Sequence, residues 1–211
     1  IKQGNFLLQD LHTSEPQRPF FNIFWLALGL VAKIFSLSPT LVFHLTKLVL
    51  VPILVYSIFI FLRLFITSSI KLKTALVFLT LASGCGIIFW NWLPFPYNYL
   101  WDFSIPETTI FQSIYSSPHF IASWILIILS FYFLTNGYLK NRTADIIKAG
   151  LAALILTQFH PFYALLLITV PTVYAFILYL KEKNNNHLIK WLVFELFLAP
   201  SILYYLYLQS D

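Results

Sequence analysis

The sequence predicts an all-α protein, a polytopic transmembrane helical bundle with an interfacial juxtamembrane helix. Hydrophobic residues make up 59% of the chain and charged residues only 10%, against roughly 45–50% and about 25% in soluble domains. Aromatic residues reach 19%, which suits a chain that meets two membrane interfaces repeatedly, because Trp and Tyr settle there. Several apolar stretches are also long enough to cross a bilayer. Together these observations exclude a soluble domain. The chain has no Met, so we expect a fragment, residues 1–211, of a longer protein's single transmembrane domain.

Four stretches meet the requirement of about 20 mainly apolar residues for a spanning helix. They are residues 41–66, 72–93, 119–137 and 188–208. An earlier stretch, 20–37, is close to the minimum length and ends at Ser38-Pro39. It can either cross the membrane or lie along the interface as a juxtamembrane helix.

The stretch 146–180 is too long for one crossing. At 1.5 Å per residue a helix of this length extends roughly 52 Å, whereas the bilayer core is about 30 Å thick. His160-Pro161 lies near its middle, and proline both lacks a backbone donor and disfavours helical geometry in the preceding residue. We therefore expect a hairpin of two helices, 146–159 and 161–180.

The distribution of charge predicts which loops share a side of the membrane. With this hairpin, and with 20–37 not crossing, three loops on one side hold eight of the 13 Lys and Arg residues: Lys71, Lys73, Lys140, Arg142, Lys148, Lys181, Lys183 and Lys190. The other side receives the loops 1–19 and 94–118, the turn at residues 158–162 and Asp211, and so holds five of the eight acidic residues. Because cytoplasmic loops are rich in Lys and Arg, we expect an integral, multi-pass protein of the plasma or inner membrane, with loop 94–118 non-cytoplasmic. The net charge of +5 then belongs to cytoplasmic loops and does not indicate a nucleic-acid partner.

The first candidate site is the polar loop before residue 20. Asp10, His12, Glu15 and Arg18 lie within nine residues of one another. Carboxylates can deprotonate an acceptor hydroxyl or bind a divalent cation through oxygen, and Arg matches a pair of phosphate oxygens. A solvated loop that caps the following helix is the alternative interpretation.

Two further candidates lie later on the same predicted side. The loop 94–118 is longer than the usual 12–15-residue limit for structureless connections and contains Glu107, with His119 directly after it. Gln158 and His160 flank the predicted helix break, where polar groups are costly unless they have partners. The structural alternatives are a helix N-terminal charge for Glu107, an interfacial histidine for His119, and satisfaction of backbone groups freed by Pro161 for His160.

The run Glu15-Pro-Gln-Arg-Pro-Phe-Phe-Asn-Ile-Phe-Trp-Leu-Ala-Leu-Gly29, followed by Phe35-Ser-Leu-Ser38, resembles the end of the first outer loop of GT-C glycosyltransferases. This superfamily includes the dolichyl-phosphate-mannose and aminoarabinose transferases. The resemblance implies a GT-C-like fold, a polyprenyl-phosphate-linked sugar as donor, and an outer-loop aspartate as catalytic base. Asp10 matches that aspartate best, and Glu15 is the second acidic candidate.

The expected reaction is an inverting sugar transfer on the non-cytoplasmic face. Asp10 or Glu15 acts as the base, and Glu107 orients the acceptor. Residues expected to bind the donor or the acceptor are His12, Arg18, His119 and His160. The candidate cofactor is a divalent cation. Two other functions are compatible with the residues: a transporter or permease with a site at His160 and Gln158, and a non-catalytic membrane assembly subunit.

Overall fold

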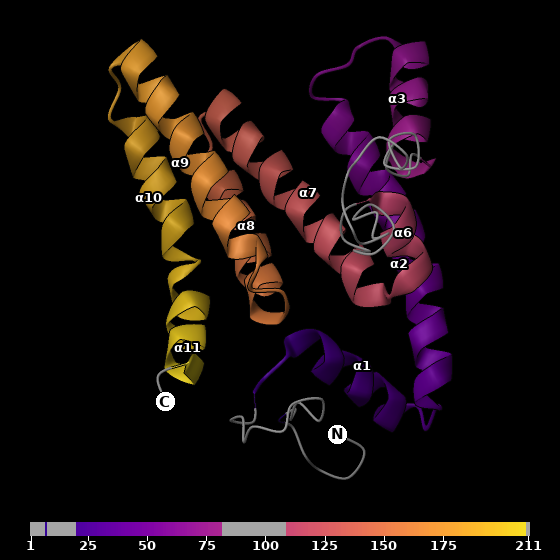
Figure 1. Ribbon diagram of the computed structural model, residues 1–211. Helices are drawn as coiled ribbons and strands as arrows, with labels where there is room; N and C mark the ends of the chain where they lie inside the picture. The colour runs from indigo at the N-terminus through magenta and orange to yellow at the C-terminus, as the bar shows by residue number, and fades with distance from the viewer. Residues whose placement is uncertain (1–6, 8–19, 82–108, 210–211) are drawn as a thin grey trace, which may run out of the picture. The chain divides into compact units, whose positions relative to one another are not determined.

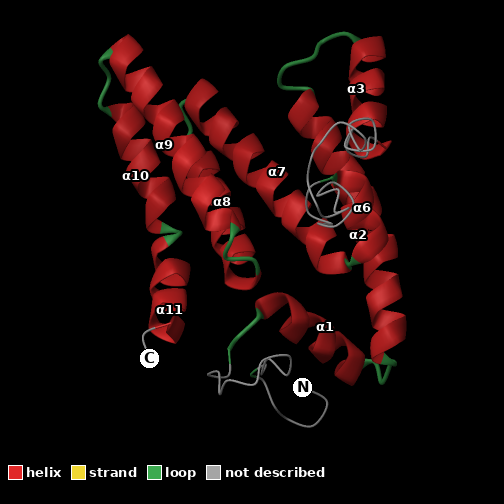
Figure 2. Cartoon of the chain, viewed as in Figure 1, coloured by secondary structure: helices red, strands yellow, loops and turns green. Residues whose placement is uncertain are grey.

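The computed structural model describes residue 7, residues 20–81 and residues 109–209. In these ranges the chain forms nine α-helices and no strand (Figures 1 and 2), so the predicted all-α class is confirmed. The chain divides into two compact units. The first comprises Ile1–Val42 and Leu129–Asp211, and the second Phe43–Ile128.

The first unit is built around α8 (Thr143–Phe159). This helix contacts α1 (Ile23–Ile34), α9 (Tyr163–Glu182), α10 (Asn186–Leu196) and α11 (Ala199–Gln209). Small residues on its buried face let neighbouring backbones approach closely, as in many membrane helix pairs. They are Ala149, Gly150, Ala152 and Ala153. Ser130, on α7 (Pro118–Leu139), donates a 3.2 Å hydrogen bond to the carbonyl of Ala149.

Helices α8 and α9 form an antiparallel hairpin (Figure 1). The side chain of Asn186, at the start of α10, donates a 3.0 Å hydrogen bond to the side chain of Asn141, which precedes α8. The end of α9 and the start of α8 therefore lie at the same end of this unit. The stretch 146–180 is two helices joined at residues 160–162.

The sequence predicted a single helix over the stretch 188–208, but the structure has a bend in this stretch. It consists of α10 and α11, bent by 41° relative to each other. Pro200 has no N–H to donate and its ring disfavours a continuous helix, and Phe197 and Leu198 donate to carbonyls only three residues earlier. Gly150 faces this bend: a Cβ there would lie 2.4 Å from Cδ2 of Phe197.

The second unit contains most of α2 (Pro39–Leu62), together with α3 (Ser69–Leu81) and α6 (Ile110–Ser116). Ser38 caps the start of α2 by accepting a 3.2 Å hydrogen bond from the Leu41 N–H, a role that serine favours. Lys47 on α2 donates to the carbonyls of Tyr115 (2.7 Å) and Ser116 (3.3 Å) at the end of α6. A lysine at this position satisfies carbonyls that have no intrahelical partner.

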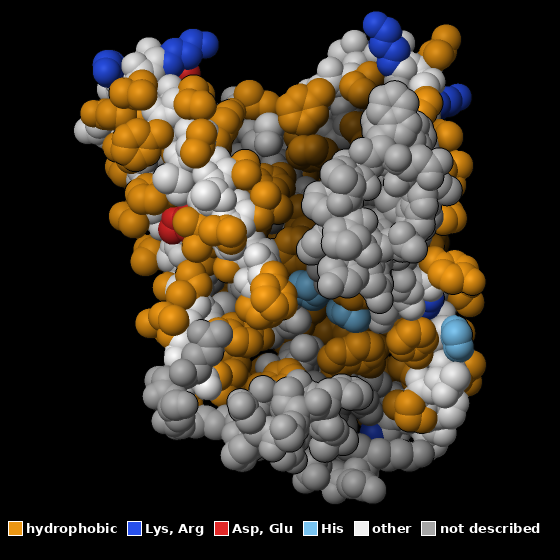
Figure 3. All heavy atoms as spheres, in the orientation of Figure 1, with side chains coloured by type: hydrophobic (Ala, Val, Ile, Leu, Met, Phe, Trp, Pro, Cys, Tyr) orange, Lys and Arg blue, Asp and Glu red, His pale blue; other side chains and the backbone are white. Residues whose placement is uncertain are grey.

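Three of the described helices are long and apolar enough to cross a membrane: α2, α7 and α9. The bent pair α10–α11 makes a fourth if it counts as one span. Only 17% of the most apolar window is buried in α2 and in α9, so both helices present apolar surface outward, as lipid contact requires (Figure 3). Helix α1 has 12 residues, about 18 Å at 1.5 Å per residue, which is too short to cross a core of about 30 Å.

Candidate functional site at the turn between α8 and α9

His160 and Pro161 interrupt the chain between α8 and α9. The backbone N–H of His160 still closes the last turn of α8, donating to Leu156 at 2.9 Å, and the Ala164 N–H donates to the Pro161 carbonyl at 2.9 Å. The His160 side chain is buried, and its ring lies 4.9 Å from that of Tyr163. The imidazole is therefore held between the two helices by aromatic packing.

A polar network joins the end of α8 to α11. Thr157 donates to Ser201 Oγ at 2.9 Å, and Gln158 Nε2 donates to the same oxygen at 2.8 Å. Tyr205 donates from its hydroxyl to the carbonyl of Gln158 at 2.8 Å. Thr157 and Ser201 are fully buried. Four polar side chains from two helices are thus concentrated beside the turn.

A pocket of about 160 Å³ opens beside this network. Its lining is largely apolar and includes three hydroxyl groups. The lining residues are Thr157, Pro161, Ala164, Ser201, Ile202, Tyr205 and Leu206. Ligand sites for whole drug-sized molecules usually have roughly 300–1,000 Å³, so this pocket fits part of a ligand, such as a segment of a lipid chain next to a polar group.

The start of α1 lies at the same end of the first unit. The Phe21 N–H donates a 2.7 Å hydrogen bond to the hydroxyl of Tyr204 on α11, and the ring of Phe24 lies 5.4 Å from that of Phe159. Asn22 caps α1, accepting from the Trp25 N–H at 3.2 Å. Helix α1 is therefore fixed to the ends of α8 and α11, beside the turn.

Only two of the residues predicted for the site lie in the described part of the chain. His160 is at the turn of the first unit. His119 is in the second unit at the start of α7, where its Nδ1 lies 2.7 Å from Ser117 Oγ and its ring 3.9 Å from that of Phe120. The remaining five lie outside the described residues: Asp10, His12, Glu15, Arg18 and Glu107.

Sequence reasoning missed three residues of this site: Thr157, Ser201 and Tyr205. Ser201 lies in an apolar run 43 residues after Gln158, and no local pattern connects them. The available signal was a small polar residue directly after Pro200 in an apolar stretch, since such residues often form bonds between membrane helices.

Glu195 lies away from this site, on α10, and does not pair with Lys190. Its carboxylate accepts a 3.1 Å hydrogen bond from Trp191 Nε1, and Trp191 also donates to Thr172 on α9 at 2.9 Å. Lys190 points elsewhere, donating to the Gly137 carbonyl at 3.1 Å. Five helical residues turn a side chain by about 140° at 3.6 residues per turn, so the two groups lie on different faces of α10.

No group of three or more potential metal-ligating side chains occurs among the described residues. The cluster considered for a divalent cation, Asp10, His12 and Glu15, lies outside them. No known protein family, curated protein or solved structure shows a significant match to this chain.

Proposed function

We propose that this chain is part of an integral membrane glycosyltransferase that moves a sugar from a polyprenyl-phosphate donor to an acceptor on the non-cytoplasmic face. The observation that carries the proposal is the attachment of α1 to α11 beside the polar turn. The predicted acidic loop is covalently joined to α1 at this point, since Arg18 precedes Phe21 by three residues. We propose that a base in this loop acts beside His160, Ser201 and Tyr205.

The location of the turn supports a site at the membrane surface. Helix α9 is a candidate span, and the turn lies at its N-terminal end, whereas a transporter site at a broken helix lies near the bilayer midplane. Helix α8 has 17 residues, about 25 Å at 1.5 Å per residue. The turn therefore lies almost one bilayer-core thickness from the start of α8. A lipid-linked donor has its phosphate at the surface and its chain in the bilayer, which matches a largely apolar pocket with three hydroxyl groups in its lining.

The proposed reaction is a direct displacement at the anomeric carbon of the sugar. Asp10, or Glu15, accepts the proton of the acceptor hydroxyl. The acceptor oxygen forms the new bond to the anomeric carbon, and the polyprenyl phosphate leaves from the opposite face with the electron pair of the broken bond. Arg18 and His160 bind the phosphate and stabilise the charge that develops on it. The configuration of the sugar is inverted.

The experiment is a transfer assay in membranes that contain the whole protein, with radiolabelled polyprenyl-phosphate mannose and polyprenyl-phosphate aminoarabinose as donors. We expect transfer by the wild type and its loss in Asp10→Asn or Glu15→Gln at equal protein level. His160→Gln should raise the donor concentration needed for half-maximal rate. Full transfer by both carboxylate variants would remove the site, and no transfer by the wild type with either donor would contradict the proposal.

A further inference from the structure

Two turns of the first unit that are far apart in the sequence form one surface. The turn between α7 and α8 and the turn between α9 and α10 are joined by the 3.0 Å hydrogen bond from Asn186 to Asn141. Two further hydrogen bonds link α7 to α10: Tyr138 donates to the His187 carbonyl at 3.2 Å, and Lys190 donates to the Gly137 carbonyl at 3.1 Å. Lys190 is buried. The relative position of the two turns is therefore fixed by three contacts.

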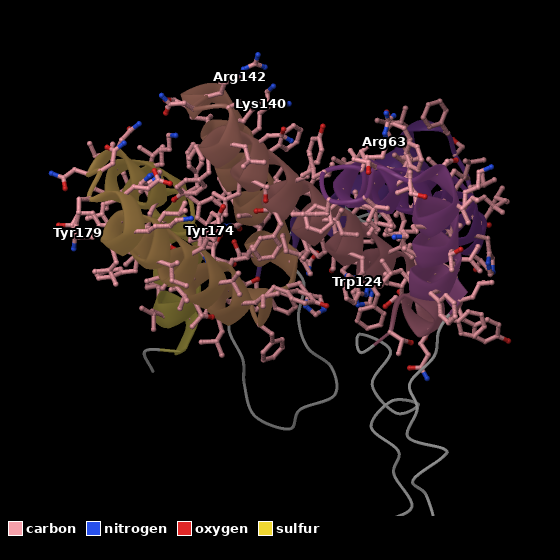
Figure 4. All side chains as sticks on the ribbon, turned by 90° about the horizontal axis from the view of Figure 1, so that it is seen from above. Arg63, Trp124, Lys140, Arg142, Tyr174 and Tyr179 are labelled. Atoms are coloured by element: carbon pink, nitrogen blue, oxygen red, sulfur yellow. The ribbon has the colours of Figure 1, made fainter. Side chains whose placement is uncertain are left out.

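Four exposed cationic side chains lie on these turns: Lys140, Arg142, Lys181 and Lys183. We refer to them as the two-turn cationic surface (Figures 3 and 4). Figure 4 shows Lys140 and Arg142 pointing away from the helices, and Figure 3 shows Lys and Arg side chains gathered at this end of the unit. Among the described residues, no ion pair involves any of the four.

The two carboxylates of this part of the chain have other partners. Asp145 is 3.5 Å from Lys148, and Glu182 is 2.7 Å from Nε2 of His187. Neither of these contacts involves the two-turn cationic surface. Its positive charge is therefore available to a ligand that approaches from outside the protein.

The depth of the surface identifies the ligand. Two candidate spans end here, α7 at Leu139 and α9 at Glu182, and the last apolar side chains before the cations, Leu139 and Leu180, are exposed. Cations placed directly after a lipid-facing helix end lie at the level of lipid headgroups. Arg142 can also bind two phosphate oxygens at once, which a phosphodiester offers.

We propose that the two-turn cationic surface binds the phosphate of an anionic phospholipid headgroup. Lys140 and Arg142 provide one half of the site and Lys181 and Lys183 the other, and the three contacts between the turns keep the halves together. The site is independent of the proposed sugar transfer, because it lies at the opposite end of α9 from His160.

The test is native mass spectrometry of the whole protein in detergent, titrated with phosphatidylglycerol or with phosphatidylcholine. A cation near an anionic membrane surface contributes roughly a fivefold change in affinity. We therefore expect Lys140→Gln with Arg142→Gln, and Lys181→Gln with Lys183→Gln, each to weaken phosphatidylglycerol binding roughly 25-fold. Phosphatidylcholine carries the same phosphodiester but no net charge, so we expect it to bind the wild type more weakly and to lose much less affinity in both variants. An unchanged circular dichroism spectrum would show that the variants are folded.

The matched control is Lys71→Gln with Lys73→Gln, which removes two cations from the second unit. We expect it to leave phosphatidylglycerol binding within about twofold of the wild type. Asn186→Ala combined with Tyr138→Phe keeps every charge but removes two of the three contacts between the turns, and we expect it to weaken binding severalfold. Equal affinity for the two lipids, an equal loss in the Lys71 and Lys73 variant, or full affinity in the Asn186 and Tyr138 variant would each overturn the proposal.

Discussion

Gly150 allows α8 to pack against the bend between α10 and α11. A Cβ at this position would lie 2.4 Å from Cδ2 and 3.0 Å from Cβ of Phe197, and the latter atom cannot move without its backbone. We expect Gly150→Ala to lower the free energy of unfolding by about 1–3 kcal/mol, the usual cost of overpacking. The measurement is unfolding of the purified protein in mixed micelles. Leu151→Ala, at an exposed neighbouring position, should change stability much less.

Ser201 is the shared partner of Thr157 and Gln158, so removal of its hydroxyl affects two side chains. We expect Ser201→Ala to cost about 0.5–1.5 kcal/mol, because Gln158 and Thr157 each lose a partner, although the Thr157 hydroxyl keeps its bonds to the Ala153 and Leu154 carbonyls. Ser57 provides the comparison: it is also buried, but its hydroxyl bonds only to the Ile53 carbonyl of its own helix, at 2.8 Å. Ser57→Ala should therefore be nearly neutral. Equal losses in the two variants, measured by the same unfolding assay, would show that the network adds nothing.

The location of the turn at His160 could be predicted from the sequence, whereas its partners could not. Proline acts on its immediate neighbours, so Pro161 identifies the break without knowledge of the fold. Ser201 and Tyr205 contact the turn only because α11 packs on α8, which depends on long-range packing. The predicted base and its neighbours, Asp10 to Arg18, remain predictions of the sequence.

At the scale of helices, proline also marks a break at Pro200, which the sequence prediction did not include. Pro200 bends the chain between α10 and α11 by 41°, but the stretch 188–208 was predicted as one helix because its hydrophobicity is continuous. Hydropathy measures burial in lipid, and it does not distinguish a straight span from a bent one. His160-Pro161 was recognised because the stretch around it was too long for one crossing, and 188–208 offered no such contradiction.

Lys47 ties the short helix α6 to α2 in the second unit. With seven residues, α6 is too short to be stable by itself in water, so its order depends on contacts such as those from Lys47 to Tyr115 and Ser116. We expect Lys47→Ala to speed amide hydrogen exchange across α6 at least severalfold, with little change in α8. His44→Ala, at an exposed position one turn earlier on α2, is the control. Unchanged exchange in α6 after Lys47→Ala would contradict this role.

At the scale of the whole molecule, the sequence predicted membrane segments from hydropathy and their orientation from the placement of Lys and Arg. The structure has three or four helices that are long and apolar enough to span a membrane. Within the first unit, the Asn141–Asn186 bond brings the two basic turns of that unit to one end. The prediction that these two loops share one side of the membrane depended on the hairpin at His160. A single crossing by 146–180 would have separated them.

The orientation of the hairpin can be tested by the accessibility of single cysteines. In a variant with Cys85→Ser, we would introduce one cysteine at Phe162, which is 85% exposed at the turn, or at Lys140 or Lys183 on the basic turns. A membrane-impermeant maleimide should label Phe162→Cys in intact cells, because the positive-inside rule predicts that the basic turns lie in the cytoplasm and the hairpin turn outside. Lys140→Cys and Lys183→Cys should react only after the cells are broken. Labelling of Lys183→Cys and Phe162→Cys from the same side would contradict the hairpin as a membrane crossing. Full reversal of the labelling pattern would move the proposed transfer site to the cytoplasmic face.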